Sequence, residues 1–311
     1  MHRIALVIMV LAGLMVSGSV SPAFGYVIPG PFVIEKMLDS LDLPEGMRVK
    51  QEIRIPSGSQ TAASKSTEPI AQVPEGVGPV RGPKTAPENK AEPARAFVQQ
   101  VRYRLPEAFR SDIETARLNR IHVFYRGESI TVLDGRVVSG GPAWHTCYKD
   151  LFLFSSRKPM VRYLERLGID MDQSSLGRMD KNLVYVLGAR YPDKSRQQIW
   201  VDKASFRPVR WIVTPAEDPQ SPPVHEIRYR EWRQKGDTWY PGTIEFYENG
   251  EKAQTMAVQQ FWADSGIPAD LFDIGVLRRT YGRSDEKAPE EGEPGEEIRE
   301  EIEEFKNIYE Y

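Results

Sequence analysis

Apolar and polar residues alternate with period two along most of the chain between Met47 and Trp262. Val209, Trp211 and Val213 alternate with Arg210 and Thr214. The same pattern recurs in four apolar pairs, Val101 and Tyr103, Ile199 and Val201, Ile227 and Tyr229, and Ile244 and Phe246. Such alternation predicts antiparallel strands with one buried face. Nine or ten strands fit this stretch, and a sheet of that many strands must curl or close.

Turn signals separate the predicted strands at short intervals. They are Arg126-Gly127-Glu128, Asp134-Gly135, Lys235-Gly236-Asp237 and Glu248-Asn249-Gly250-Glu251. Glycine and asparagine at these positions favour tight hairpins. The sheet is therefore expected to be built largely from neighbouring hairpins.

Two segments have helical instead of alternating spacing. The first runs from Pro31 to Leu41, and the second follows the cap Ser155-Ser156 and ends at Gly168. Their apolar faces are Ile34, Met37, Leu38 and Leu41, and Met160, Tyr163, Leu164 and Leu167. We expect both helices on the concave side of the curled sheet. The concave face of so wide a sheet exceeds what two short helices fill, which predicts an apolar cavity.

Two low-complexity segments interrupt this pattern. Residues 56–95 consist largely of Pro, Gly, Ser, Thr, Ala, Lys and Glu, and are flanked by predicted strands Met47–Ile55 and Phe97–Leu105. Residues 284–311 contain twelve acidic and three basic residues. Neither segment has enough apolar side chains to form a core. We therefore predict one domain over 26–283, with 56–95 as a disordered insertion between adjacent strands and 284–311 as an acidic tail.

The first 25 residues predict a cleaved secretory signal peptide. A basic start at Arg3 precedes an apolar run from Ile4 to Val16, and Ala23 and Gly25 form a small-residue cleavage site. A membrane anchor is the alternative, but polar and small residues interrupt the run before it reaches about 20 apolar positions. We expect cleavage after Gly25 and a mature protein without a membrane span.

The remaining chemistry argues against catalysis. The whole chain has a net charge of −3, and 26–283 contains 37 basic and 32 acidic residues, which is too mild an excess for nucleic-acid binding. None of the four histidines has metal-ligand spacing to another histidine or to Cys147. No nucleophile motif or phosphate-binding glycine loop occurs. We predict no enzyme activity, no cofactor and no metal. The alternatives for Cys147 are a small buried apolar residue, which we favour, and a reactive thiol.

Four phrases, taken in order, resemble periplasmic outer-membrane lipoprotein carriers of the LolA/LolB type. They are Arg104-Leu105-Pro106-Glu107-Ala108-Phe109-Arg110; Gln198-Ile199-Trp200-Val201-Asp202-Lys203 with Phe206-Arg207-Pro208-Val209-Arg210-Trp211; Trp239-Tyr240-Pro241; and Ile267-Pro268-Ala269-Asp270-Leu271-Phe272. Each phrase is short, so their order carries the resemblance. It covers Pro31 to Phe272 apart from the insertion.

The resemblance implies a mainly β fold, a curled and unclosed antiparallel barrel with two lid helices over an apolar cavity that takes acyl chains. It implies an inner-membrane donor and an outer-membrane acceptor as partners, and Arg104 is the closest match to an arginine that holds the lid shut. The expected cavity lining is Val101, Tyr103, Ile199, Val201, Val209, Trp211, Ile244 and Phe246. The expected lid is formed by the two apolar helix faces named above.

Two functions from different classes follow. The first is a periplasmic carrier that shields acyl chains of a lipoprotein or lipid during sorting to the outer membrane. The second is a regulatory module on the same fold that senses a lipid or a protein and reports through the acidic tail. A carrier should be found loaded with lipid, whereas a sensor should co-purify with an envelope protein.

Overall fold

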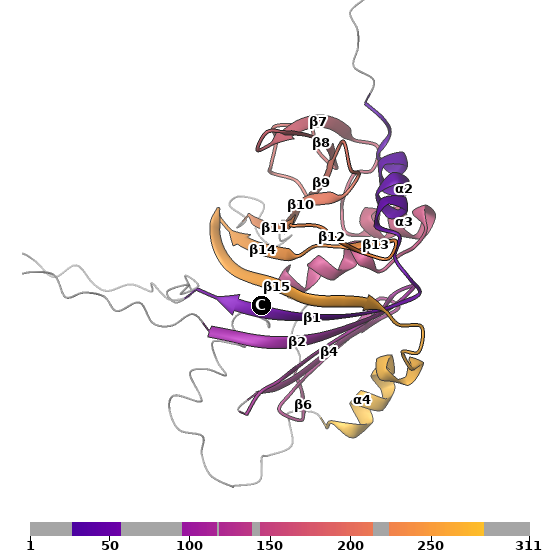
Figure 1. The fold of residues 1–311 in the computed structure, drawn as a ribbon, viewed down its shortest axis with the longest axis vertical. Helices are drawn as coiled ribbons and strands as arrows, with labels where there is room; N and C mark the ends of the chain where they lie inside the picture. The colour runs from indigo at the N-terminus through magenta and orange to yellow at the C-terminus, as the bar shows by residue number, and fades with distance from the viewer. Residues whose placement is uncertain (1–26, 57–94, 117, 139–143, 214–223, 283–311) are drawn as a thin grey trace, which may run out of the picture.

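The computed structural model describes residues 27–56, 95–116, 118–138, 144–213 and 224–282. The predicted signal peptide, nearly all of the predicted insertion and the predicted acidic tail lie outside these ranges. Within them the chain is dominated by strands, joined by a few short helices (Figure 1).

Thirteen strands form one antiparallel sheet in the order β6-β5-β4-β3-β2-β1-β15-β14-β11-β10-β9-β8-β7, and β12 and β13 form a separate hairpin. The bounds are β1 (Gly46–Ile55), β2 (Arg95–Arg104), β3 (Ala108–Glu114), β4 (Asn119–Tyr125), β5 (Glu128–Leu133), β6 (Arg136–Val138), β7 (Ser174–Met179), β8 (Asn182–Leu187), β9 (Gln198–Asp202), β10 (Pro208–Val213), β11 (His225–Arg230), β12 (Arg233–Lys235), β13 (Thr238–Tyr240), β14 (Thr243–Glu248) and β15 (Glu251–Ala263). The predicted number of nine or ten strands is therefore too low. Strands of three residues, such as β6, β12 and β13, are too short to show a period.

The sheet curls but does not close, because its two edge strands, β6 and β7, do not pair with each other. Register shifts interrupt three ladders, at Lys50/Gln51, Pro208/Arg210 and Phe246/Tyr247. Such bulges bend a strand and increase its local twist. The predicted fold class, a curled and unclosed antiparallel sheet with lid helices, is confirmed.

Strands β1 and β2, which flank the predicted insertion, are adjacent and in register from Gly46↔Arg104 to Ile55↔Arg95. All four predicted turns also join paired strands: β4 to β5, β5 to β6, β12 to β13 and β14 to β15.

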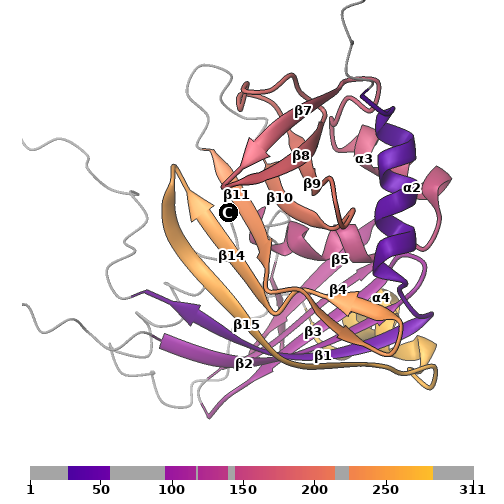
Figure 2. The ribbon, with the colours of Figure 1, turned by 45° about the horizontal axis from the view of Figure 1, so that its top comes forward.

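The concave side of the sheet is covered by α2 (Gly30–Leu41), η2 (Trp144–Phe152, a 3₁₀ helix) and α3 (Arg157–Arg166). Figure 2 shows α2 and α3 side by side along one rim of the curled sheet. The chain leaves the sheet at edge strand β6, continues through η2 and α3, and re-enters it at the opposite edge, β7. One connection thus spans the gap between the edges. No helix in the described ranges is long and apolar enough to cross a membrane.

The convex side has a smaller apolar layer that the sequence did not predict. The 3₁₀ helix η3 (Ala269–Phe272) and α4 (Ile274–Thr280) cover Ile121, Val123, Ile130 and Val132 of β4 and β5. The Asp273 side chain caps α4 by accepting a hydrogen bond from the backbone N–H of Val276. Two turns of helix are too few to give a clear period, so this element was missed.

Candidate functional site

The concave face is one continuous apolar core to which seven of the eight predicted lining residues belong. These are Val101, Tyr103, Ile199, Val201, Trp211, Ile244 and Phe246, each at most 1% exposed. They come from β2, β9, β10 and β14, so one face spans both halves of the sheet. The predicted face of these strands is confirmed, while their role as a ligand site stays a prediction.

Val209 is the exception, and the expectation for it was wrong. It is partly buried against Val184, Val186 and Trp200 on the convex face. The cause is the bulge in β10: Pro208 opposes Val201 and Arg210 opposes Trp200, so Val209 is the extra residue. Counting back from Trp211 in steps of two fails where a residue is inserted into the ladder.

The predicted lid faces lie where expected. Ile34, Met37, Leu38, Leu41, Met160, Tyr163 and Leu164 are buried in the concave core, and Leu167 packs against it half-buried. Two hydrogen bonds hold the C-terminal end of α2: Ser40 Oγ donates to the Phe206 carbonyl at 3.0 Å, and Thr238 Oγ1 donates to the Asp42 carbonyl at 2.9 Å. Arg157 of α3 forms an ion pair with Glu35 of α2.

Arg104 does not act as the expected latch. It alternates with the buried Tyr103, so it lies on the opposite, convex side of β2, and it is exposed. The lid helices lie on the concave side. Leu105 separates Arg104 from Pro106, and along a strand a step of one residue changes the face to which a side chain points.

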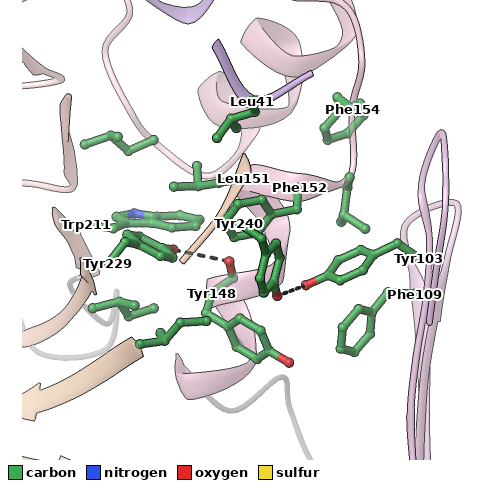
Figure 3. Close-up of a cluster of buried hydrophobic side chains, with 14 of the residues drawn as sticks. Leu41, Tyr103, Phe109, Tyr148, Leu151, Phe152, Phe154, Trp211, Tyr229 and Tyr240 are labelled. Carbon is green, nitrogen blue, oxygen red and sulfur yellow. Dashed lines mark hydrogen bonds between the residues drawn. The ribbon is translucent and has the colours of Figure 1, made fainter. Parts of the chain in front are cut away.

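Helix η2, which sequence reasoning missed, fills the concave face (Figure 3). Phe152 packs against Tyr240 with ring centroids 4.8 Å apart and against Tyr229 at 5.9 Å. Tyr148 packs edge-on against Phe109 and Phe246 at 6.2 and 6.0 Å. The space predicted to be an open cavity is thus occupied by side chains of the protein itself.

A few hydrogen-bonding groups project from the sheet into this core. The hydroxyls of Tyr103 and Tyr240 lie 3.0 Å apart, and Tyr229 Oη donates to the backbone carbonyl of Tyr148 at 3.2 Å (Figure 3). The Trp211 indole N–H is buried and finds no acceptor within the described part of the chain. The sheet therefore offers isolated polar handles within an apolar surface.

Helix η2 also buries an ion pair. Lys149 Nζ lies 2.7 Å from Asp150 Oδ1, and their side chains are only 5% and 3% exposed. The ammonium lies over the rings of Phe109 and Phe124 at 5.8 and 4.8 Å. Burial raises the pKa of Asp150, opposed by Lys149 and by a hydrogen bond from Tyr163. Removing two charges from water is costly, so this pair offsets part of the stability that the η2 aromatics contribute.

Three buried histidines mark one polar end of the concave core. His122 Nδ1 lies 3.0 Å from Thr131 Oγ1, and the His225 ring stacks on Trp144 at 4.2 Å. Burial lowers the pKa of all three, to about 4 for His225, to about 3 for His145 and well below its usual value for His122. They are neutral at pH 7. In the described part of the chain, no three His, Cys, Asp or Glu residues are grouped to hold a metal.

Cys147 lies on η2 and is partly buried. Burial raises the pKa of its thiol to about 12, so almost none of it is thiolate at neutral pH. This environment supports the interpretation of Cys147 as a packed, unreactive residue in this state.

A hollow of about 450 Å³ lies on the convex side, next to η3. Its charged lining includes Arg102 and Arg110, both paired with Asp112, and Arg110 also donates to the Leu271 carbonyl at 3.0 Å. Both arginines therefore already have acceptors on the protein, and Glu114 completes the charged lining.

No family model matches the sequence, and no curated protein matches it. Solved structures do. They include a putative outer membrane lipoprotein-sorting protein domain from Vibrio parahaemolyticus (12% identity, TM-score 0.49) and a LolA superfamily protein from Nitrosomonas europaea (12%, 0.44). A DUF1329 family protein from Desulfovibrio piger is similar too (14%, 0.46).

The alignments cover 80% of this chain and 98%, 100% and 97% of the three structures, in the order given.

Proposed function

We propose that this protein is a carrier that binds acyl chains of a lipoprotein or lipid on the concave face of its sheet. In the unloaded state η2 occupies that face. Binding exchanges the aromatic side chains of η2 for the acyl chain, and α2 and α3 move with it as a lid. The reaction is transfer of an apolar group between environments and involves no covalent step.

One observation carries this proposal: the segment that fills the concave face is the same segment that spans the gap between the sheet edges. In the described part of the chain between β6 and β7, η2 is followed by α3 and no strand occurs. The sheet ladders from β6 to β7 are complete without it. The apolar wall can therefore persist while its covering is displaced.

Two properties of η2 favour displacement. It is a 3₁₀ helix of nine residues, and 3₁₀ hydrogen bonds are poorer in geometry than those of an α-helix, so runs beyond three or four residues are uncommon. It also contains the buried Lys149–Asp150 pair, whose charges regain hydration when the helix leaves the core. Burying one CH₂ group stabilises by about 0.8 kcal/mol, so an acyl chain of ordinary length can compensate for the lost η2 contacts.

The carrier role includes an export step and two partners. We propose that residues 1–25 direct export and are cleaved after Gly25, that the protein works in the periplasm, and that a membrane donor and an outer-membrane acceptor load and unload it. A sensing module on the same fold remains the second candidate, and it would be recognised by a stable envelope-protein partner.

A matched pair of substitutions tests the proposal. Phe152 of η2 and Phe109 of β3 are both buried in the same cluster, at 0% and 1% exposure. Phe152→Leu weakens the covering, whereas Phe109→Leu damages the wall. Each should cost roughly 1–2 kcal/mol of stability.

Binding of a fluorescent fatty-acyl probe should respond in opposite directions. We expect Phe152→Leu to bind about tenfold more tightly and Phe109→Leu to bind more weakly than wild type. Thermal unfolding of both variants controls for folding. Equal effects of both substitutions on probe affinity, or no probe binding by any folded variant, would show that the concave face is only a core.

A further inference from the structure

The Trp211 indole N–H is a hydrogen-bond donor that is buried on the concave face and has no acceptor among the described residues. Trp211 lies on β10, opposite Ile199 of β9 and Ile227 of β11, and is 1% exposed. An indole N–H can only donate, and leaving such a group unpaired in an apolar core is unfavourable. A phenylalanine would supply an apolar ring here without that cost, so the N–H calls for a partner.

A second and a third donor belong to the same region. The Trp232 N–H, just beyond β11, is also buried without an acceptor, and its ring packs near Phe152 of η2. Tyr229 of β11 donates its hydroxyl to the backbone carbonyl of Tyr148. In the unloaded state one of these donors, the Tyr229 hydroxyl, is thus already hydrogen-bonded to a backbone carbonyl of η2, as Figure 3 shows.

Positive charge is scarce around these donors. The described concave-facing residues of β10, β11 and β14 include Trp211, Val213, His225, Ile227, Tyr229, Ile244, Phe246 and, next to His225, Glu248. None is Lys or Arg, and His225 is held neutral by burial. Lys149 is part of η2 and leaves with it. Arg120 of β4 is also buried in this core, but at its histidine end, beside His145. A carboxylate placed beside Trp211 and Tyr229 would be desolvated with no cation on the same strands, whereas a neutral carbonyl would only need donors.

This inference rests on the proposed acyl binding. We infer that the site binds acyl chains that carry a neutral ester or amide carbonyl. That carbonyl accepts one hydrogen bond from Trp211 and a second from Tyr229, where it replaces the carbonyl of Tyr148. The ligand class is therefore O-acyl or N-acyl compounds, in preference to free fatty acids or alkyl ethers. Trp211 acts as a specificity-determining residue.

The test compares three ligands of equal chain length, 1-decanoyl glycerol, 1-O-decyl glycerol and decanoic acid, by calorimetry or by displacement of a fluorescent probe. Wild type should bind the ester at least about fivefold more tightly than the ether, and the acid most weakly. Trp211→Phe should bind the ether as wild type does but lose the preference for the ester. Trp239→Phe, whose ring lies under Arg207, is the matched control and should keep that preference.

Tyr229→Phe supplies an independent readout. It removes a donor to the ligand and also the hydrogen bond that holds η2, so the ether should bind more tightly while the ester preference shrinks. An unchanged ester-to-ether ratio in Trp211→Phe would overturn this inference and leave acyl binding intact. Failure of folded wild type to bind either glycerol derivative would instead contradict the proposed function itself.

Discussion

His225 shows how burial at the polar end of the concave core couples stability to pH. Its ring stacks on Trp144, and burial lowers its pKa to about 4 although Glu248 lies 3.8 Å away. An unfolded histidine has a pKa of about 6.5. The unfolded chain therefore takes up this proton first, so stability is full above about pH 6.5 and is lost as pH falls toward 4.

We predict that His225→Phe, which retains a ring for Trp144, reduces this dependence. Between pH 6.5 and 5 the free energy of unfolding of wild type should fall by up to about 2 kcal/mol more than that of the variant. Urea unfolding at a series of pH values measures the difference. Parallel curves for the two proteins would show that His225 is not buried in its neutral form.

At the scale of single residues, the alternating pattern predicted most of the concave face, and two positions were wrongly placed. Val209 is displaced by the bulge in β10. Arg104 directly follows Tyr103, and in a strand one residue changes the face, so the alternation already places it away from the lid. A bulge leaves no mark in the hydrophobic pattern, so Val209 could not be placed without the ladder itself.

At the scale of elements, the long strands, α2 and α3 could be predicted because each repeats its apolar spacing several times. The four turns could be predicted from their glycine and asparagine residues. Helix η2 could not. Its buried residues include His145, Thr146, Lys149 and Asp150 as well as Tyr148, Leu151 and Phe152, so they show neither period two nor a single apolar helical face. A helix that is buried on nearly every side, and whose charged residues pair with each other, cannot be predicted from the spacing of its apolar residues.

The missed element changes the interpretation of the site. Two lid helices over a wide sheet predicted an open cavity, whereas the structure has a third element inside it. The apolar wall is the one predicted from the sequence, and the occupant is the chain's own aromatic side chains.

At the scale of the whole molecule, the predicted insertion and acidic tail should be dispensable for folding. Ile55 and Arg95 are ladder partners, so a short Gly-Ser turn from Ile55 to Ala96 can close the β1–β2 hairpin. Ending the chain at Arg283 keeps the hydrogen bond from the Val137 N–H to the Gly282 carbonyl. We expect the shortened protein to melt within a few degrees of the full chain. A loss of more than about 10 °C, far beyond the effect of 1 kcal/mol, would mean that one of the removed segments packs on the sheet.

The central claim is that an acyl chain replaces η2 on the concave face, and Cys147 reports on it without any substitution. In the unloaded protein burial raises the pKa of this thiol to about 12, so it should react slowly with a disulfide reagent at pH 8. A thiol exposed to water has a pKa of about 8.5 and is partly ionised at that pH. Displacing η2 should therefore accelerate the reaction.

The rate of Cys147 modification, measured with and without a long-chain acyl glycerol, tests this claim most directly. We expect at least a tenfold faster reaction once the long-chain ligand is bound, no change with a butanoyl glycerol of the same head group, and a far-ultraviolet circular dichroism spectrum that keeps the signal of the sheet. A bound long-chain ligand that leaves the Cys147 rate unchanged would show that η2 stays in the core and that acyl chains bind elsewhere.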